Sequence, residues 1–341
     1  MKKLITILVI LFTTLFASSD ISSGREGGTY IQIAKEISQV VAKDIGLSMR
    51  VIESNGSKDN IVNMIKNPDV KFAIVQHDII EFLKRSRKEE FNQLVNRLKV
   101  LLPLYMEEVH IVVRKDSNIR YLQDIRNRKV AIGPKGSGTA LTTLLIYEME
   151  FGKGSLTSNM IDRSPLEVAL KKLANGEVDV VFTVGAQPIS ALNSLENRYR
   201  LIPITSNRVL SYYYETKIKR ESYPWLKEDI PTAGVISLLI CNSANSISEY
   251  QMREFGRDFA RRLEYLKSVG HKRWQEVKRR LPPLPSTQSW RYCKEFKRGW
   301  DSFINSFRPN SNIRPNRDSI RQNYNPNRRC SPEEEALHLC P

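Results

Sequence analysis

Several residue patterns that mark common enzyme classes are missing from this chain. Histidine occurs only four times in 341 residues, and no two histidines have the HExxH spacing of a zinc protease. The G-x-S-x-G turn that holds the nucleophile of an α/β-hydrolase is also missing. His77 and Asp78 are neighbours in sequence, but a base and the acid that orients it must meet in space. We therefore expect no catalytic function, and neither a metal nor a cofactor.

Long apolar runs are scarce, because residues 4–16 form the only one that approaches the length of a membrane span. Two lysines precede this run, and small residues ending at Ser19 follow it. A basic start, a short apolar segment and small residues are the pattern of a secretory signal peptide. A membrane span takes about 20 apolar residues, more than this run supplies. We expect residues 1–19 to be a signal peptide and the mature protein to be periplasmic.

Cysteine is also sparse, with four residues in the chain. In an oxidising compartment four cysteines can pair in three ways. Cys241 follows the apolar run 235–240 and is expected to be a buried thiol. Cys330 and Cys340 flank a short acidic segment and are the pair that we expect to form a disulfide. The remaining cysteine is Cys293.

Acidic residues are few relative to basic ones, 37 against 53, which gives a net charge of +16. An excess of this size can indicate nucleic-acid binding, but an exported protein rarely meets nucleic acid, so we expect no such partner. The excess is uneven, since basic residues outnumber acidic ones by about two to one from residue 245 onward. This difference predicts a C-terminal appendage with its own chemistry.

The appendage divides into two parts. Apolar spacing within residues 247–281 and 290–307 predicts helices, so residues 245–307 are expected to form a helical C-terminal extension. Residues 308–341 are basic and rich in Asn and Pro, with little to bury, and are expected to be a flexible tail. The basic residues of this region either contact an anionic surface or an acidic partner, or form a solvated face.

Between residues 24 and 242 the pattern alternates strand and helix. Apolar periodicity predicts a helix over 30–45, a serine opens another over 57–66, and a proline opens a third over 165–174. The expected strands are short β-rich runs at 48–53, 71–76, 100–104, 109–114, 129–133, 178–184 and 201–204. Such alternation implies an α/β fold with open, largely parallel sheets, in which ligands bind beyond the carboxyl ends of the strands.

The loops at these strand ends share a polar, flexible character. Small residues and hydroxyl or amide groups fill residues 27–30, 54–57, 76–78, 133–139 and 185–188, and most of these loops lead into a helix. The loop GPKGSGT at 133–139 joins a strand to a helix start, a geometry that binds anions. Thr139 stands where a phosphate-binding loop has lysine, so nucleotide hydrolysis is disfavoured. Together the loops predict a site that surrounds a small polar molecule.

These motifs, taken in order, resemble those of the TAXI family of TRAP-transporter solute receptors. The resemblance covers residues 24–242 and rests on GGTY, SNGSKDN, FAIVQHD, LYMEEVHIVVRKDS and GPKGSGT, which begin at residues 27, 54, 72, 104 and 133. It implies a two-lobed periplasmic binding protein of the type II kind. Such a receptor closes on a small carboxylate, glutamate or a related dicarboxylate, and delivers it to a TRAP-type membrane permease. Two departures from the family pattern are a very short first strand, at residues 20–24, and Asn55.

The resemblance also implies the residues of the ligand site. The motif positions that match are Thr29, Tyr30, Ser57, Asn60, Gln76, Asp78, Ser137, Gly138 and Thr139, and we expect Gln187 to join them after the strand at 178–184. Structural interpretations remain open for some of these residues. Tyr30 can be the first core residue of its helix, and Ser57 and Asp78 can be ordinary N-caps. A purely structural role is harder to assign to Gln76, because a buried amide costs free energy unless it is paired.

We therefore expect an exported two-lobed receptor. Residues 20–104 and 211–244 are assigned to lobe 1 and residues 105–210 to lobe 2, with two crossings between them. The alternative is a periplasmic sensory or interaction protein that keeps the receptor fold and signals to a membrane partner, because a fold alone does not decide function.

Overall fold

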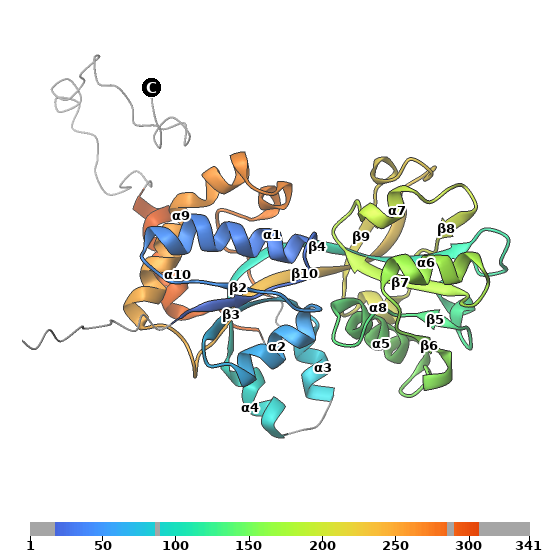
Figure 1. Ribbon diagram of the computed structural model, residues 1–341, viewed down its shortest axis with the longest axis horizontal. Helices are drawn as coiled ribbons and strands as arrows, with labels where there is room; N and C mark the ends of the chain where they lie inside the picture. Colours follow the sequence, from blue (N-terminus) through green and yellow to red (C-terminus); the bar gives the residue numbers. More distant parts are fainter. Residues whose placement is uncertain (1–17, 86–88, 285–289, 307–341) are drawn as a thin grey trace, which may run out of the picture.

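The computed structural model describes residues 18–85, 89–284 and 290–306. The signal peptide expected over residues 1–19 lies almost entirely outside this part of the chain, as do the tail 308–341 and the cysteine pair Cys330 and Cys340. Two lobes lie side by side with the C-terminal helices against the first of them (Figure 1). None of the helices in the described ranges has the length and apolar character needed to cross a membrane.

One mixed sheet of ten strands runs through both lobes (Figure 1). Its main order is β2-β1-β3-β10-β4-β7-β5-β6, while β8 pairs with β4 and β9 pairs with β10. The strands are β1 (Asp20–Ser22), β2 (Val51–Ile52), β3 (Val70–Gln76), β4 (Leu98–Arg114), β5 (Val130–Ala131), β6 (Ile161–Asp162), β7 (Val180–Gly185), β8 (Tyr199–Leu201), β9 (Tyr214–Ile218) and β10 (Ile230–Asn242).

The expectation of largely parallel sheets is correct only for the outer part of each lobe. β1 pairs in parallel with β2 and β3, and β5 pairs in parallel with β6 and β7. The two long strands between them, β4 and β10, run antiparallel to each other and to the neighbouring strands β3 and β7. Because β4 and β10 pass from one lobe to the other, they form the two crossings.

The two strands expected at 100–104 and 109–114 are one strand, β4, and that prediction was wrong. Residues 105–108 separated the two expected strands, and the apolar pattern breaks there at Glu107 and Glu108. Both residues are nevertheless buried, at 4% exposure each, within the continuous strand. The pattern fails here because the strand crosses between the lobes, where buried side chains need not be apolar.

The helices connect these strands and cover the sheet. They are α1 (Thr29–Glu36), α2 (Ser57–Lys66), α3 (Ile79–Arg85), α4 (Glu89–Arg97), α5 (Gly138–Phe151), α6 (Leu166–Ala174), α7 (Ser190–Asn193), α8 (Asn207–Leu210), α9 (Glu249–Val269) and α10 (Lys294–Ser306). The helix expected over 30–45 begins as α1 and continues as a π-helical segment, Ile37–Ala42. Those expected over 57–66 and 165–174 are α2 and α6, the latter with Pro165 at its N-cap.

The first lobe holds the short strand β1 at the centre of its parallel strands. β1 lies between β2 and β3, and the Asp20 carboxylate accepts hydrogen bonds from the Arg50 side chain, at 2.7 Å for Nη2 to Oδ2. Three residues are therefore enough for this strand, and residues 27–30 follow it into the start of α1. The exact lobe boundaries near residues 104 and 210 stay a prediction.

The C-terminal extension packs against the first lobe. The aromatic side chains of Phe255 and Phe259 from α9 and of Phe296 and Trp300 from α10 are fully buried in the same cluster as Ile33 of α1. The two helices cross closely, since a Cβ on Gly299 would lie 1.8 Å from the Arg253 carbonyl oxygen. The helix expected over 247–281 is shorter, because α9 ends before Gly270 and a 3-10 turn, Lys272–Glu276, follows.

Candidate functional site

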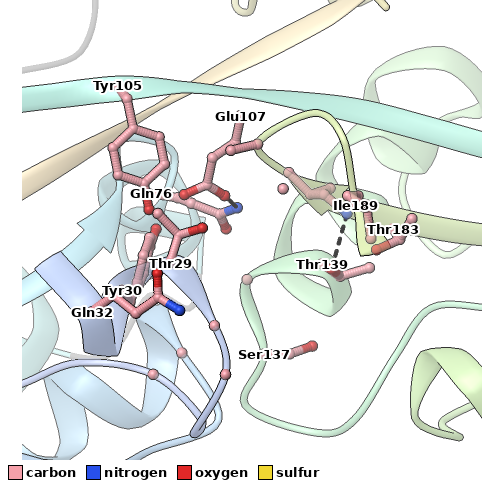
Figure 2. A pocket seen from close by; sticks show the side chains of 18 of the residues that line it. Thr29, Tyr30, Gln32, Gln76, Tyr105, Glu107, Ser137, Thr139, Thr183 and Ile189 are labelled. Carbon is pink, nitrogen blue, oxygen red and sulfur yellow. Dashed lines mark hydrogen bonds between the residues drawn. The ribbon is translucent and has the colours of Figure 1, made fainter. Parts of the chain in front are cut away.

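A cavity of about 490 Å³ opens between the lobes at the ends of the strands (Figure 2). The first lobe lines it with residues 27–30 and 55–57 and with Gln76, and the second lobe with residues 137–139 and 183–186. Tyr105 and Glu107 of the crossing strand β4 complete its inner wall. The loops that the sequence placed beyond the strand ends thus contribute to one pocket.

Three helices begin at this pocket. The starts of α1, α2 and α5 contribute Thr29, Ser57 and Gly138 to its lining. The first turn of a helix leaves N–H groups without intrahelical partners and carries a partial positive charge, so each start favours an anion. Because α1 and α2 belong to the first lobe and α5 to the second, an anion held here contacts both lobes.

The two lobes approach each other closely at Gly138. A Cβ at this position would lie 2.0 Å from Oε1 of Gln76, which belongs to the other lobe. A side chain at this position would require the Gln76 amide to move, so Gly138 allows the start of α5 to lie against the amide of Gln76. This close approach explains why a glycine opens the helix, and it places Gln76 between the lobes.

Glu107 is a buried carboxylate on the inner wall of the pocket. Its Oε2 accepts a hydrogen bond of 2.7 Å from Nε2 of Gln76 (Figure 2), while its Oε1 has no hydrogen-bond partner among the described residues. Burial raises the pKa of Glu107 to about 7, while the hydrogen bond from Gln76 and the nearby Tyr30 hydroxyl lower it. The Oε1 atom of Gln76 is also buried and accepts no hydrogen bond from a described residue, so each of these two side chains has one unpaired acceptor oxygen.

Two tyrosines stand beside this carboxylate. The rings of Tyr30 and Tyr105 meet edge to face with centroids 6.4 Å apart, and both residues line the pocket. Burial raises the pKa of each hydroxyl well above its ordinary value, and neither hydroxyl has a hydrogen-bond partner of good geometry among the described residues. Tyr30 therefore fits both interpretations left open by the sequence, since it also packs against the core of the first lobe.

Ser57 and the residues at the start of α5 use their side chains mainly for the scaffold. Ser57 is not an N-cap, because Gly56 occupies that position; the Ser57 Oγ accepts a hydrogen bond of 2.9 Å from the Gln76 backbone N–H. Ser137 caps α5, accepting from the Ala140 N–H at 3.1 Å. Thr139 Oγ1 accepts from the Val184 N–H at 3.1 Å (Figure 2).

Asn60 does not lie in the pocket lining. Its side chain is fully buried within the first lobe and makes four hydrogen bonds. Oδ1 accepts from the hydroxyls of Ser22 and Ser54, and Nδ2 donates to the carbonyl oxygens of Ser23 and Ile74. The amide has no capacity left for a ligand, so the structure gives Asn60 a scaffold role.

Asp78 also lies outside the pocket lining, although it is fully buried. Its Oδ2 accepts hydrogen bonds from Thr142 Oγ1 of α5 at 2.7 Å and from the Tyr213 hydroxyl at 2.8 Å. Burial raises the pKa of Asp78 to about 6, while these two donors lower it. Because α5 starts in the second lobe, Asp78 fastens the lobes together behind the pocket.

Gln187 turns its side chain away from the pocket. Its Oε1 accepts from the Lys219 N–H and the Ser222 hydroxyl, both at 2.7 Å, and its Nε2 donates to the Lys217 carbonyl at 3.0 Å. Its neighbours Ala186 and Pro188 line the pocket instead. The loop expected at the site therefore lines the pocket through these neighbours, and a role of Gln187 in ligand binding stays a prediction.

Sequence reasoning missed several residues of the pocket. Glu107 and Tyr105 lie inside the motif LYMEEVHIVVRKDS, where two acidic residues interrupt an apolar run, and that interruption was the available signal. His271 and Lys272 come from the C-terminal extension, and no pattern in the sequence connects them with the distant loops. Across the described residues, no cluster of three or more His, Cys, Asp or Glu side chains is arranged to hold a metal ion.

The two lobes, the mixed sheet and the crossing strands match the fold of type II periplasmic binding proteins. A solved structure of a protein from Bordetella bronchiseptica RB50 is similar with a TM-score of 0.51 at 11% identity, covering 85% of this chain and 98% of that one. The arginine-, lysine- and histidine-binding protein ArtJ of Geobacillus stearothermophilus matches with a TM-score of 0.45 at 15% identity, over 78% of this chain and 97% of its own. Such identities show the fold alone.

A protein from Xanthomonas citri, in a structure with bound ATP, matches with a TM-score of 0.48 at 12% identity, over 85% of this chain and 100% of its own. The sequence itself matches the NMT1-like family over residues 21–252. The chain belongs to this family. The matched range ends inside α9, so the remainder of the C-terminal extension lies beyond it.

Proposed function

We propose that this protein is a periplasmic solute receptor of the TAXI type, which captures a small carboxylate between its lobes and delivers it to a TRAP-type membrane permease. The observation that carries this proposal is the meeting of three helix starts from both lobes at one pocket. A carboxylate at this point gains favourable interactions from both sides at once. Those interactions exist together only when the lobes are closed, so binding favours closure.

Glu107 narrows the class of ligand. A carboxylate buried beside a bound dicarboxylate would repel it, whereas a protonated amine on the ligand pairs with the free Oε1 of Glu107. The pocket therefore has an anion-binding end at the helix starts and a cation-binding end at Glu107 and Gln76. This arrangement favours glutamate, or another acid that carries an amine, over dicarboxylates without one.

The experiment is a thermal-shift screen of the mature protein, followed by calorimetry on each compound that stabilises it. The panel consists of L-glutamate, L-glutamine, 2-oxoglutarate and succinate. We expect L-glutamate to raise the melting temperature, and the rise should grow with its concentration because the ligand binds only the folded protein. The compound should be recovered unchanged, with no product formed. Absence of stabilisation by every compound in the panel, or turnover of any of them, contradicts the proposed function.

A further inference from the structure

The 3-10 turn after α9 is fixed to the first lobe beside the pocket. The backbone N–H of His271 donates to Glu36 Oε1 at 2.8 Å, and the indole N–H of Trp274 donates to Glu36 Oε2. Glu36 is the last residue of α1, whose first turn lines the pocket. Trp274 is fully buried, so the turn is held by packing as well as by hydrogen bonds.

Arg273 reaches from this turn to the second lobe. Its side chain is nearly buried, at 8% exposure for the residue, and its Nη2 donates to the backbone carbonyl oxygen of Gln187. Its Nη1 forms an ion pair with Glu276, and its guanidinium lies 6.0 Å from the ring centroid of Tyr105. One guanidinium thus contacts the extension, the crossing strand β4 and the loop after β7.

The loop that Arg273 contacts is part of the pocket wall. Ala186 and Pro188, on either side of Gln187, line the cavity. The Gln187 N–H also donates to Oε2 of Glu108 at 3.0 Å, and that same oxygen lies 4.0 Å from Arg273. Both backbone groups of Gln187 are therefore held, its carbonyl oxygen by Arg273 and its N–H by Glu108.

The positive charge of Arg273 is balanced by Glu276 of the same turn, which also binds the crossing strand β4. Glu276 pairs with Arg273 through Oε1, and its Oε2 accepts a hydrogen bond of 2.9 Å from the Met106 N–H. Met106 lies between Tyr105 and Glu107, both of which line the pocket. The turn is thus tied to the residue next to the cation-binding end of the pocket.

We propose that the C-terminal extension is part of the ligand site and that Arg273 is the positioning residue through which it acts. Arg273 holds the loop at residues 186–188 in the place that the ligand requires, so the affinity of the pocket depends on a segment outside the range of the NMT1-like match. The ligand class follows from the proposed function, whereas the positioning of the loop is independent of it. Only an arginine supplies the planar fork that reaches Gln187 and Glu276 together.

The test compares Arg273→Met, Arg273→Lys and the wild-type chain. Hydrogen exchange of the ligand-free protein is followed at residues 183–192, and calorimetry measures the affinity for L-glutamate as the probe. We expect exchange in this segment to become at least about tenfold faster in Arg273→Met, because the hydrogen bond from Arg273 to the Gln187 carbonyl oxygen is lost. Affinity for the probe should fall about tenfold, and Arg273→Lys should lie between this variant and the wild type, since lysine keeps the charge without the fork.

The matched control is Arg261→Met on α9. Arg261 pairs with Asp258 of α9 and with Asp44 of the first lobe, and none of the three residues lines the pocket, so exchange at residues 183–192 and probe affinity should not change. Unchanged exchange in both Arg273 variants, or an equal effect of the control, overturns the proposal. Should Arg273→Met fail to fold, Arg273→Lys decides alone. If the wild-type protein binds none of the acids, the proposed function is contradicted. The exchange data still test whether Arg273 positions the loop, because they are measured without ligand.

Discussion

Two groups of buried polar side chains differ in how many of their hydrogen bonds are made within the protein. One is Asn60 inside the first lobe, and the other is the pair Gln76 and Glu107 at the pocket. The Asn60 amide makes four hydrogen bonds within the first lobe. Gln76 and Glu107 make one side-chain hydrogen bond to each other, and each has one buried oxygen that accepts no hydrogen bond from the part of the chain that the structure describes. Buried polar groups are normally satisfied, so unused acceptors beside a cavity point to a ligand. Residue type and loop position do not make this distinction.

The largest effect on stability should come from Asn60. Asn60→Ala removes these four buried hydrogen bonds, which should lower the free energy of unfolding by about 2 to 4 kcal/mol. Urea denaturation measures the loss. The control Asn63→Ala removes one hydrogen bond, to Ser22, and should cost about 1 kcal/mol. A variant that stays as stable as the control and loses only ligand affinity would return Asn60 to the site.

A substitution of Glu107 should lower ligand affinity and leave stability nearly unchanged. Glu107→Gln removes a buried carboxylate whose charged form is disfavoured by burial, so the unfolding free energy should change by less than about 1 kcal/mol. Affinity for L-glutamate should fall by about tenfold to a hundredfold, the effect of one lost charge-assisted hydrogen bond. Calorimetry and urea denaturation give both values. The control Glu264→Gln changes a carboxylate on α9 that pairs with Lys267 and should leave the affinity unchanged.

The pH dependence of stability and of ligand affinity should also differ for Glu107. Burial raises the pKa of Glu107 from its ordinary value of 4.5 to about 7, so between these values the folded protein keeps a proton that the unfolded chain has released. The stability of the ligand-free protein should therefore fall as the pH rises through this window. Affinity for an amine should move in the opposite direction, rising by up to about tenfold per pH unit until the pH exceeds 7.

Titration calorimetry between pH 5 and pH 8 checks this prediction against Glu107→Gln, which should lose most of the dependence. Asp78 contributes its own fall in stability as the pH rises from about 4 to about 6, because its pKa is raised to about 6, and that contribution should remain in the variant. Affinity that is independent of pH in the wild-type protein contradicts a role for an ionised Glu107.

Ser137→Ala should have the smallest effect on stability and ligand affinity among these substitutions. Its Oγ accepts from the Ala140 N–H and donates to the Pro134 carbonyl at 2.8 Å, so its hydroxyl serves the start of α5. Ser137→Ala should lower the unfolding free energy by about 1 kcal/mol, the usual loss for an N-cap, and weaken ligand binding by no more than about threefold. A loss of tenfold or more would show that the hydroxyl itself holds the ligand.

The sequence was sufficient for the class of fold and for the loops of the pocket. Strand and helix periodicity predicted the α/β class and placed residues 27–30, 54–57 and 133–139 at the strand ends, whereas the two lobes were implied by the resemblance of the ordered motifs to a known family. These predictions depend on local patterns, which a single sequence carries. The parallel arrangement was wrong for the central strands β4 and β10, because strand direction depends on which strands pair, and β10 returns beside β4 from more than a hundred residues away.

The individual side chains of the site were harder to predict. Asn60, Asp78 and Gln187 have the residue types of a polar site, but their partners come from distant segments such as Ile74, Tyr213 and Ser222. Lys272 enters the pocket from an extension whose position depends on the packing of α9 and α10 against the first lobe. Local sequence does not encode such contacts, which are made only when the chain is folded.

The preference for an amine tests the account most directly. Calorimetry should compare L-glutamate with glutarate, which has the same chain length and both carboxylates but no amine, on the wild-type protein and on Glu107→Gln. We expect the wild-type protein to bind L-glutamate at least about tenfold more tightly, a difference of about 1.4 kcal/mol, and the variant to lose that preference. Equal affinity of the wild-type protein for the two acids would contradict the assignment of Glu107 as the cation-binding end of the pocket.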